Sequence, residues 1–303
     1  MVMCMKVLSF GSVNIDQIFN LDHFPYVGES LAANEYSIVA GGKGLNQTIA
    51  AARAGLPVFF GGMIGLDGDI IRNVLKSEPN VNVSNLLVVD SVKTGTAVIQ
   101  VNQNGENSII VYGGSNQQIS PANIDRVLDG FSSGDVLIMQ NEISHTEYLL
   151  KAAYKKGMTI FFTPAPFSSE LTTMDAVQYA SWLLLNEGEG AMLSGVEGEP
   201  ALICKALAAK FQNTKIVLTL GAKGSLCYDG QDLIAQRAYK VKAIDTTAAG
   251  DTFAGFFISR LLAGDSINTS LDFASRASAI CVTRPGASPS IPTYEEVQNG
   301  ILK

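Results

Sequence analysis

Residues 245–253, Asp-Thr-Thr-Ala-Ala-Gly-Asp-Thr-Phe, decide the fold of this chain. Apolar residues recur at helical spacing from Phe253 onward, and they predict a helix that begins inside this stretch. Upstream, Val241 and Ile244 indicate the end of a strand. A turn of small residues between a strand and a helix leaves backbone N–H groups and a partial positive charge open to an anion. The residues that would form this anion cradle are Ala248, Ala249 and Gly250.

The carboxylate of Asp251 directly follows the small residues. Beside an anion site it is a candidate general base, which suits phosphoryl transfer because that reaction depends on positioning and charge neutralisation. The alternative is that Asp251 only caps the helix and that the small residues only pack closely. This stretch alone favours neither alternative, and other parts of the chain weigh on the choice.

The composition bounds the class of protein. The chain has 303 residues, of which 47% are hydrophobic, enough for one large domain with or without a small appendage. The formal net charge of −7 argues against nucleic acid as a partner, because that binding relies on clustered Lys and Arg. No apolar run suits a membrane span, and the first residues lead into a strand instead of a cleavage site, so we expect a cytoplasmic protein. The cysteines form no C-x-x-C pair and are expected to be reduced core residues: Cys4, Cys204, Cys227 and Cys281.

The order of elements predicts the architecture. In the second half of the chain, continuous apolar strands alternate with helices, which predicts an α/β fold with a doubly wound, mainly parallel sheet and helices on both faces. Two β-rich runs, Thr94–Val101 and Asn107–Tyr112, flank an Asn-Gly pair, which predicts a hairpin. This hairpin, within 92–113, and extended segments within 14–40 are expected to form a small sheet beside the main one. We expect 1–303 to be a single domain.

Four polar clusters follow apolar strands in this scheme: Asn14 with Asp16, Asn141 with Glu142, Asn186 with Glu189, and residues 245–251. Ligands of open α/β sheets bind beyond the carboxyl ends of the strands, so we expect the clusters to form one site. Two of the pairs also have a purely structural interpretation. The first could orient a polyol or form an Asx turn, and the third could organise Mg²⁺ for nucleotide phosphates or form a capping box.

Two glycine-rich stretches also have two interpretations each. Residues 41–44, Gly-Gly-Lys-Gly, could bring backbone N–H groups and Asn46 to a small polar molecule, or could simply begin a helix with Lys43 in solvent. Residues 220–224, Leu-Gly-Ala-Lys-Gly, could line nucleotide phosphates or form an ordinary turn between two strands.

Over essentially its whole length the chain resembles the ribokinase/phosphofructokinase-B family of carbohydrate kinases. Residues 11–16 and 41–47 are similar to the family's sugar-binding signature, and residues 245–253 are similar to its catalytic signature. Residues 282–292 resemble its C-terminal loop. The resemblance implies a ribokinase-like fold and an ATP- and Mg²⁺-dependent kinase that phosphorylates a primary hydroxyl of a small sugar. The sugar it implies is D-ribose, which would become ribose 5-phosphate.

The resemblance also implies a role for each matching residue. Substrate contacts are implied for Asn14, Asp16, Gly42, Lys43, Asn46, Glu142 and Asp251, with Asp251 as the base. The anion hole would consist of N–H groups of Ala248, Ala249, Gly250 and Asp251. ATP would contact Asn186, Glu189, Thr219, Gly221, Gly224 and Gly250, and Mg²⁺ would be held through water by Asn186 and Glu189. A monovalent cation, expected to be K⁺, would be held by Asp245, Thr247, Arg284, Gly286 and Ser290. The small sheet would be a lid that also forms a homodimer interface.

Two departures from the family pattern leave the substrate open. Pro285 stands where a residue other than proline is expected, and residues 113–116 differ from the usual run near the lid. Alternative substrates are a deoxypentose, fructose, a keto-deoxy acid or a nucleoside. An alternative of another class is a catalytically silent sugar-binding or regulatory protein. A dinucleotide-dependent oxidoreductase is disfavoured, because no G-x-G-x-x-G follows the first strand.

Overall fold

A nine-stranded sheet forms the centre of the computed structural model, which describes residues 5–300, and its strand order is β13-β12-β11-β10-β9-β8-β1-β4-β5. Neighbouring strands are parallel except in the pairs β11/β12 and β12/β13. The strands are β1 (Val7–Phe10), β4 (Val58–Ile64), β5 (Val81–Val88), β8 (Val136–Gln140), β9 (Thr159–Thr163), β10 (Trp182–Asn186), β11 (Lys215–Thr219), β12 (Ser225–Tyr228) and β13 (Leu233–Gln236). The central strands β1 and β8 are buried at every residue, as a parallel sheet covered on both faces requires.

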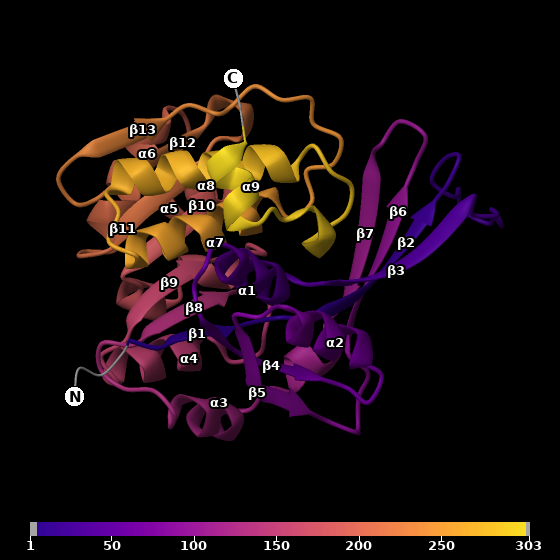
Figure 1. Cartoon of the computed structure of the whole chain (residues 1–303), viewed down its shortest axis with the longest axis horizontal. Helices are drawn as coiled ribbons and strands as arrows, with labels where there is room; N and C mark the ends of the chain where they lie inside the picture. Colours follow the sequence, from indigo (N-terminus) through magenta and orange to yellow (C-terminus); the bar gives the residue numbers. More distant parts are fainter. Residues whose placement is uncertain (1–4, 301–303) are drawn as a thin grey trace.

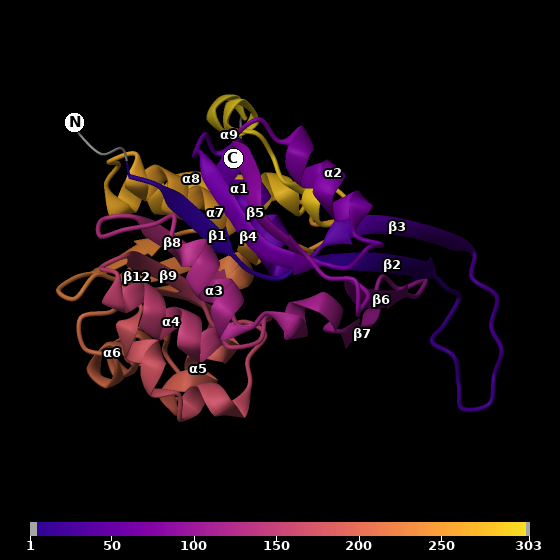
Figure 2. The same cartoon turned by 90° about the horizontal axis from the view of Figure 1, so that it is seen from below.

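Helices cover both faces of this sheet, as Figure 2 shows. On one face lie α3 (Pro121–Leu128), α4 (Thr146–Lys155), α5 (Glu187–Ser194) and α6 (Pro200–Lys210). On the other lie α1 (Lys43–Arg53), α2 (Asp69–Ser77), α7 (Ala249–Leu262), α8 (Ile267–Cys281) and α9 (Tyr294–Asn299). Short 3₁₀ turns are η1 (Gly114–Gln118), η2 (Ser169–Thr172), η3 (Asp175–Tyr179), η4 (Gly221–Lys223) and η5 (Ser288–Ser290). Each face has its own hydrophobic core, so the predicted doubly wound fold is confirmed.

A second, four-stranded sheet projects from the main body (Figure 1). Its order is β3-β2-β6-β7, with bounds β2 (Asn14–Asn20), β3 (Glu35–Gly41), β6 (Gly95–Val101) and β7 (Asn107–Tyr112). The predicted hairpin is the antiparallel pair β6/β7, and the segment between Phe10 and Gly41 supplies the other two strands. The predicted small sheet is therefore confirmed. We call it the lid sheet.

Two local predictions were wrong, and one strand was missed. Val241 and Ile244 belong to no strand, because the N–H of Ile244 donates to Val282 O at the end of α8 (2.7 Å) instead of to a neighbouring strand. Asn14 and Asp16 lie within β2 instead of in a turn after β1, which excludes the Asx-turn interpretation. The sequence interpretation also left β5 unassigned, since this edge strand mixes polar and apolar residues.

Helices α1 and α7 cross closely enough to bring two distant parts of the chain together. A Cβ added to Gly255 on α7 would collide with the Cβ of Ala50 on α1, so this glycine permits the close approach. The crossing places the N-terminal turns of both helices side by side at one edge of the main sheet, where residues 43–47 and Asp251 meet.

Two further sequence predictions concern membranes and cysteines. Between residues 5 and 300, no helix combines the length and apolar character needed to cross a membrane. Cys204, Cys227 and Cys281 are buried free thiols, as predicted, whereas Cys4 lies outside the described residues.

Candidate active site

The start of α7 forms the centre of the site. Its N-cap residue, Ala248, has a φ of 60°, a left-handed conformation that is strained for a residue with a Cβ. This turn directs the N–H of Ala249 to Thr246 O (3.2 Å). The next two N–H groups, those of Gly250 and Asp251, lie in the first turn of α7 and have no acceptor within the helix. Both residues line a cavity. The geometry therefore suits an anion at this turn.

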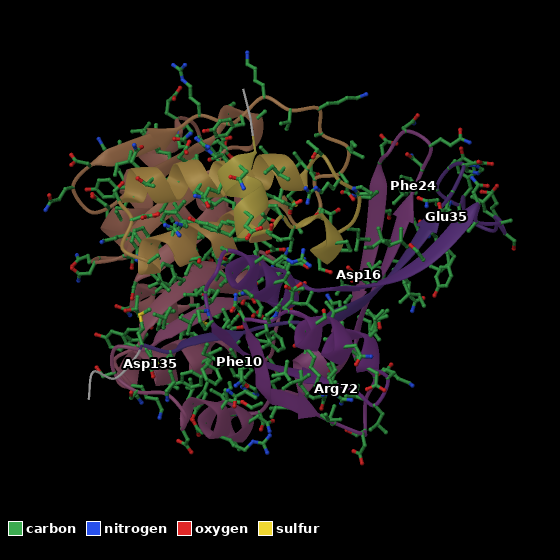
Figure 3. All side chains as sticks on the ribbon, viewed as in Figure 1. Phe10, Asp16, Phe24, Glu35, Arg72 and Asp135 are labelled. Atoms are coloured by element: carbon green, nitrogen blue, oxygen red, sulfur yellow. The ribbon has the colours of Figure 1, made fainter. Side chains whose placement is uncertain are left out.

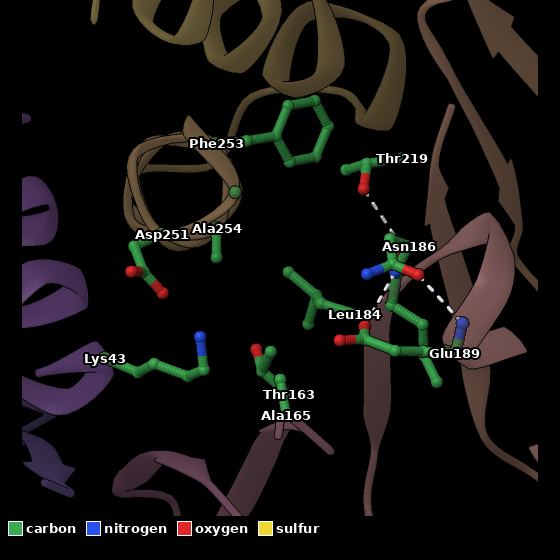
Figure 4. Close-up of a pocket in the computed structure, with 12 residues that line it drawn as sticks. Lys43, Thr163, Ala165, Leu184, Asn186, Glu189, Thr219, Asp251, Phe253 and Ala254 are labelled. Carbon is green, nitrogen blue, oxygen red and sulfur yellow. Dashed lines mark hydrogen bonds between the residues drawn. The ribbon is translucent and has the colours of Figure 1, made fainter. Parts of the chain in front are cut away.

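Two side chains of α1 hold the Asp251 carboxylate. Asn46 donates through Nδ2 to Oδ2 (3.2 Å), and Gln47 donates through Nε2 to Oδ1 (3.0 Å). Lys43, on the same helix, is half-buried, and Figure 4 shows its ammonium group and the Asp251 carboxylate pointing toward one another. The Asp251 carboxylate raises the pKa of Lys43, against an opposing effect of burial, with Glu142 and Glu189 adding to the rise. The interpretation of Lys43 as a solvated residue at a helix start is therefore wrong.

Asn14 and Asp16 lie where the lid sheet joins the main body, as the position of Asp16 in Figure 3 shows. Asn14 pairs with Gly41 and Gly95 in the lid sheet, and its Oδ1 accepts from Asn116 Nδ2 (3.0 Å). Burial raises the pKa of Asp16 to about 7, and the neighbouring Glu142 carboxylate contributes to this rise. The sugar-binding candidates thus share one buried, acidic corner.

Glu142 connects this corner to α1. Its Oε2 accepts hydrogen bonds from Ser12 Oγ and from the N–H of Lys43 (3.3 Å). Gly42 is the N-cap residue of α1, with a φ of 97°. Asn141, the predicted companion of Glu142, instead donates to Pro166 O (3.0 Å).

Two cavities meet at α7. The smaller, of about 150 Å³, is lined by Lys43, Asn186, Glu189, Thr219, Gly250 and Asp251, among others (Figure 4). The larger, of about 480 Å³, is lined by small and apolar residues that include Gly221, Ala222 and Gly224. Thr219, Gly250 and Phe253 line both. A long ligand can therefore run from the turn after β11 to the start of α7.

Asn186 and Glu189 form the capping box that was one of their two interpretations. Asn186 Oδ1 accepts from the N–H of Glu189 (2.8 Å), and Glu189 Oε2 accepts from the N–H of Asn186 (2.9 Å). Burial raises the pKa of Glu189, while the N–H of Asn186 and the charge of Lys43 oppose this rise. Within the described part of the chain, no three His, Cys, Asp or Glu side chains gather as a metal site.

Four of the five predicted cation ligands converge behind α7. Asp245 accepts from the N–H of Thr247 (2.9 Å) and from the N–H of Gly286 (2.8 Å). Burial acts to raise the pKa of Asp245, but hydrogen bonds from the side chain and N–H of Thr247 and from Gly286 outweigh it and lower the pKa. Ser290 and Thr247 meet at Cys281, whose Sγ lies 3.0 Å from Ser290 Oγ and 3.7 Å from Thr247 O. The fifth, Arg284, turns its guanidinium to Glu296 (2.6 Å), so only its backbone could contribute.

Sequence reasoning missed four side chains of the site: Ser12, Gln47, Asn116 and Gln140. Ser12, Gln47 and Asn116 lie inside motifs that were noticed, but nothing in those motifs says which distant residue they contact. Gln140 is a buried polar residue at the end of an apolar strand, and that position is the one signal that could have indicated it.

Known proteins that are similar to this chain include carbohydrate kinases. A model of the pfkB family carbohydrate kinases matches residues 5–294. The ribokinase of Haemophilus influenzae is 35% identical over 294 residues, which are 94% of this chain and 95% of that protein. A crystal structure of ribokinase from Cryptococcus neoformans in complex with ADP has a TM-score of 0.83 at 35% identity, covering 98% of this chain and 100% of that one. A structure of Arabidopsis thaliana ribokinase complexed with ribose and ATP has a TM-score of 0.84 at 29% identity, covering 98% of each chain.

Proposed function

The chain belongs to the pfkB family of carbohydrate kinases, and we propose that it transfers the γ-phosphoryl group of ATP to the 5-hydroxyl of D-ribose. The observation that carries this proposal is the position of Asp251, which stands between the anion-binding turn of α7 and the buried polar corner at the root of the lid sheet. A purely sugar-binding protein would have no use for a carboxylate beside an anion site. The ribose and ATP bound to the Arabidopsis relative support the choice of substrates.

In the proposed reaction, ribose is held through its hydroxyls by the buried corner, which comprises Asn14, Asp16, Gly42, Lys43, Asn46 and Glu142. Asp251 takes the proton of the 5-hydroxyl as that oxygen attacks the γ-phosphorus of ATP. The new P–O bond forms while the bond to the β-phosphate oxygen breaks, and ADP leaves. N–H groups of the turn Ala248–Asp251, mainly those of Gly250 and Asp251 because the N–H of Ala249 donates to Thr246 O, stabilise the charge on the transferring group. The lid sheet, within 14–40 and 92–113 of a single domain, would close over the sugar and exclude water.

The two adjoining cavities support the proposed ATP site. The phosphates would run past Asn186, Glu189, Thr219, Gly221, Gly224 and Gly250. Asn186 and Glu189 suit Mg²⁺ held through water, because an amide and a carboxylate are hard oxygen donors and the capping box fixes both. When bound, Mg²⁺ would neutralise phosphate charge. The side chains of Asn186 and Glu189 would hold its hydration shell and orient the phosphates.

We also propose a K⁺ site formed by Asp245, Thr247, Arg284, Gly286 and Ser290. Its donor set consists of a carboxylate, a hydroxyl and backbone carbonyls, which suits a hard cation. Hydrogen bonds of Asp245 to Thr247 and Gly286 join this loop to the segment that leads into α7, so a bound cation would stiffen the anion-binding turn. Pro285 stands in the loop between two of these residues.

The lid sheet is the proposed homodimer interface. Every residue of β7 is exposed, and it includes the large apolar residues Ile109, Ile110, Val111 and Tyr112. A second copy covering them would remove this apolar surface from water. Changing Ile110 to Asp should give a monomer in light-scattering chromatography, and an unchanged oligomeric state would contradict the proposal. We further propose a cytoplasmic location, because ATP as substrate and free buried thiols suit a reducing compartment.

The decisive assay measures ADP release and sugar phosphate formation with ATP and Mg²⁺ against ribose, deoxyribose, fructose, keto-deoxy acids and nucleosides, with K⁺ or without it. Turnover strongest with ribose and raised by K⁺ is expected. Turnover with a different sugar would keep the chemistry and change the substrate. Ribose binding by calorimetry without any turnover would contradict the kinase and favour the silent sugar-binding protein.

A further inference from the structure

We infer that Gln47 and Gln140 form a buried amide relay that positions Asp251 for proton abstraction. Neither glutamine exposes any surface, and the two come from different elements, α1 and β8. Gln140 Nε2 donates to Gln47 Oε1 (2.7 Å), and Gln47 Nε2 donates to Asp251 Oδ1 (3.0 Å). The inference rests on the proposed function, because it takes Asp251 to be the base.

The charge at the end of the relay fixes the direction of both amides. An ionised carboxylate only accepts hydrogen bonds, so Gln47 has to present its NH₂ group to Asp251. The amide oxygen of Gln47 then faces Gln140, which in turn has to present its own NH₂ group. If both amides were reversed, the Gln47 oxygen would face the carboxylate and repel it. A single arrangement of the three side chains is therefore self-consistent.

At the end of the relay away from Asp251, the Gln140 amide lies against backbone. Gln140 Oε1 is buried and has no hydrogen-bond partner among residues 5–300. A Cβ added to Gly11 would collide with this oxygen, so the amide lies directly against the glycine after β1. An unpaired buried carbonyl is unfavourable, and an apolar side chain of similar size would avoid that cost. The contribution of Gln140 therefore lies in its other end, the donor to Gln47.

Gln47 is better suited than Asn46 to hold the base throughout the reaction. Asn46 also donates to Asp251, but its Oδ1 is buried without a hydrogen-bond partner within the described residues, which leaves it to engage the sugar. Like Asn46, Gln47 lines neither of the two cavities, but both ends of its amide are hydrogen-bonded, one to Gln140 and the other to the base. Each carboxylate oxygen can accept two hydrogen bonds, so Asp251 keeps accepting positions toward the cavity for the hydroxyl proton. Gln47 and Gln140 are thus positioning residues that do not touch the substrate.

Within residues 5–300, the charge of Asp251 acts to raise the pKa of three other titratable groups. These are Lys43 of α1, Glu189 of α5 and Cys281 of α8. They are unchanged in the variants below, so a difference in pH profile between two variants reports on the relay.

The test compares Gln47→Met with Thr48→Val in the full chain. A hydrogen bond to an ionised carboxylate favours its ionisation, so losing the Gln47 donor should move the acidic limb of the kcat profile to higher pH. We expect kcat to fall roughly 10- to 100-fold while the KM for ribose stays within about twofold. Thr48 is the matched control, because it is equally buried on the next position of α1, and its hydroxyl donates to Gly44 O (2.6 Å) and lies 2.8 Å from Ser9 Oγ instead of contacting Asp251.

Variants of Gln140 keep the inference testable if Gln47→Met does not fold. Gln140→Met should shift the acidic limb in the same direction but less. In this variant Gln47 loses the hydrogen bond that orients its amide but keeps its own donor to Asp251. Gln140→Glu should lower kcat more than Gln140→Met does. A carboxylate at this position repels the oxygen of Gln47 and attracts its NH₂ group, so the Gln47 amide would turn away from Asp251.

The outcomes separate this inference from the proposed function. A kcat and pH profile of Gln47→Met or Gln140→Met that match those of Thr48→Val would overturn the relay, even if Asp251→Asn abolishes turnover. Turnover that survives in Asp251→Asn would instead overturn Asp251 as the base, and with it the proposed mechanism.

Discussion

The sugar-facing end of the site presents buried polar side chains, whereas its nucleotide-facing end presents small residues and backbone N–H groups. At the sugar-facing end, Asn14, Asp16 and Asn46 bury their side chains and expose at most 7% of their surface. At the nucleotide-facing end, the turn Gly221–Lys223 is exposed, and the larger cavity is lined mainly by small and apolar residues. Specificity by side-chain hydrogen bonds is thus expected for the sugar, and recognition by shape and N–H groups for the nucleotide. Substitutions should affect the two ends unequally.

The largest effect is expected where the two ends meet. Asp251→Asn keeps the shape of the side chain but removes the base, so kcat should fall roughly 10²- to 10⁴-fold. Calorimetric binding of ribose should persist, because the residues of the buried corner are unchanged. Retention of more than a tenth of the turnover would show that neither end depends on a base at this position.

The next effect comes from burial at the sugar-facing end. In the sugar-free protein, burial and Glu142 raise the pKa of Asp16 from its ordinary 3.8 to about 7. The native state therefore holds this proton more tightly than the unfolded chain, and its contribution to stability is present below about pH 4 and lost as the pH rises through about 7. Asp16→Asn should avoid that loss and stabilise the sugar-free protein at pH 8, by on the order of 4 kcal/mol at most, while weakening ribose binding.

Denaturant unfolding at pH 4 and pH 8 would measure this difference. The gain of Asp16→Asn over the natural protein should appear at pH 8 and be nearly absent at pH 4. The exposed Asp90 provides a control, since Asp90→Asn should leave the pH dependence of stability unchanged. An equal gain at both pH values would show that the acidic corner carries no electrostatic cost, and the contrast between the two ends would weaken.

A smaller effect tests the backbone as a binding surface. A Cβ added to Gly250 would meet no atom within 4 Å, and this residue lines both cavities. Gly250→Ala should therefore fold at least as well, since alanine favours a helix by about 0.5–1 kcal/mol. The methyl group would stand where the anion approaches, so kcat should fall roughly 10- to 100-fold. A stable variant with normal turnover would contradict the anion-binding role of this turn.

The sequence indicated the fold well because its strongest patterns are local. The run Val136–Gln140 is apolar throughout, as a strand in the middle of a parallel sheet has to be, and an Asn-Gly pair marks the lid hairpin. The same reasoning was wrong at Ile244. This residue is apolar, which suggested a buried strand, but 66% of its surface is exposed. The reasoning also failed at β5, because an edge strand needs no continuous apolar run.

The site was predictable only where one motif contains the whole chemistry. The stretch 245–253 carries its own turn, N–H groups and carboxylate, so local residues made Asp251 a candidate base, with a helix cap as the equal alternative until the other motifs were considered. The relay could not be, because Gln47 lies 204 positions from Asp251 and 93 positions from Gln140. Those contacts exist only because α1 and α7 cross at Gly255 and because β8 ends beneath them. They are products of the packing, which no short pattern records.

The smallest effect is expected at the nucleotide-facing end, for Lys223→Ala. Lys223 lies beside the proposed ATP site, but its side chain is 73% exposed and its Nζ lies 3.8 Å from Glu187. An exposed charge is screened by water and salt, so the KM for ATP should change by less than about threefold. Lys43→Met is the matched comparison, because that cation is half-buried and faces Asp251, and its loss should lower kcat far more. A KM for ATP raised 30-fold or more in Lys223→Ala would mean that side-chain charge, instead of shape and backbone, holds the nucleotide.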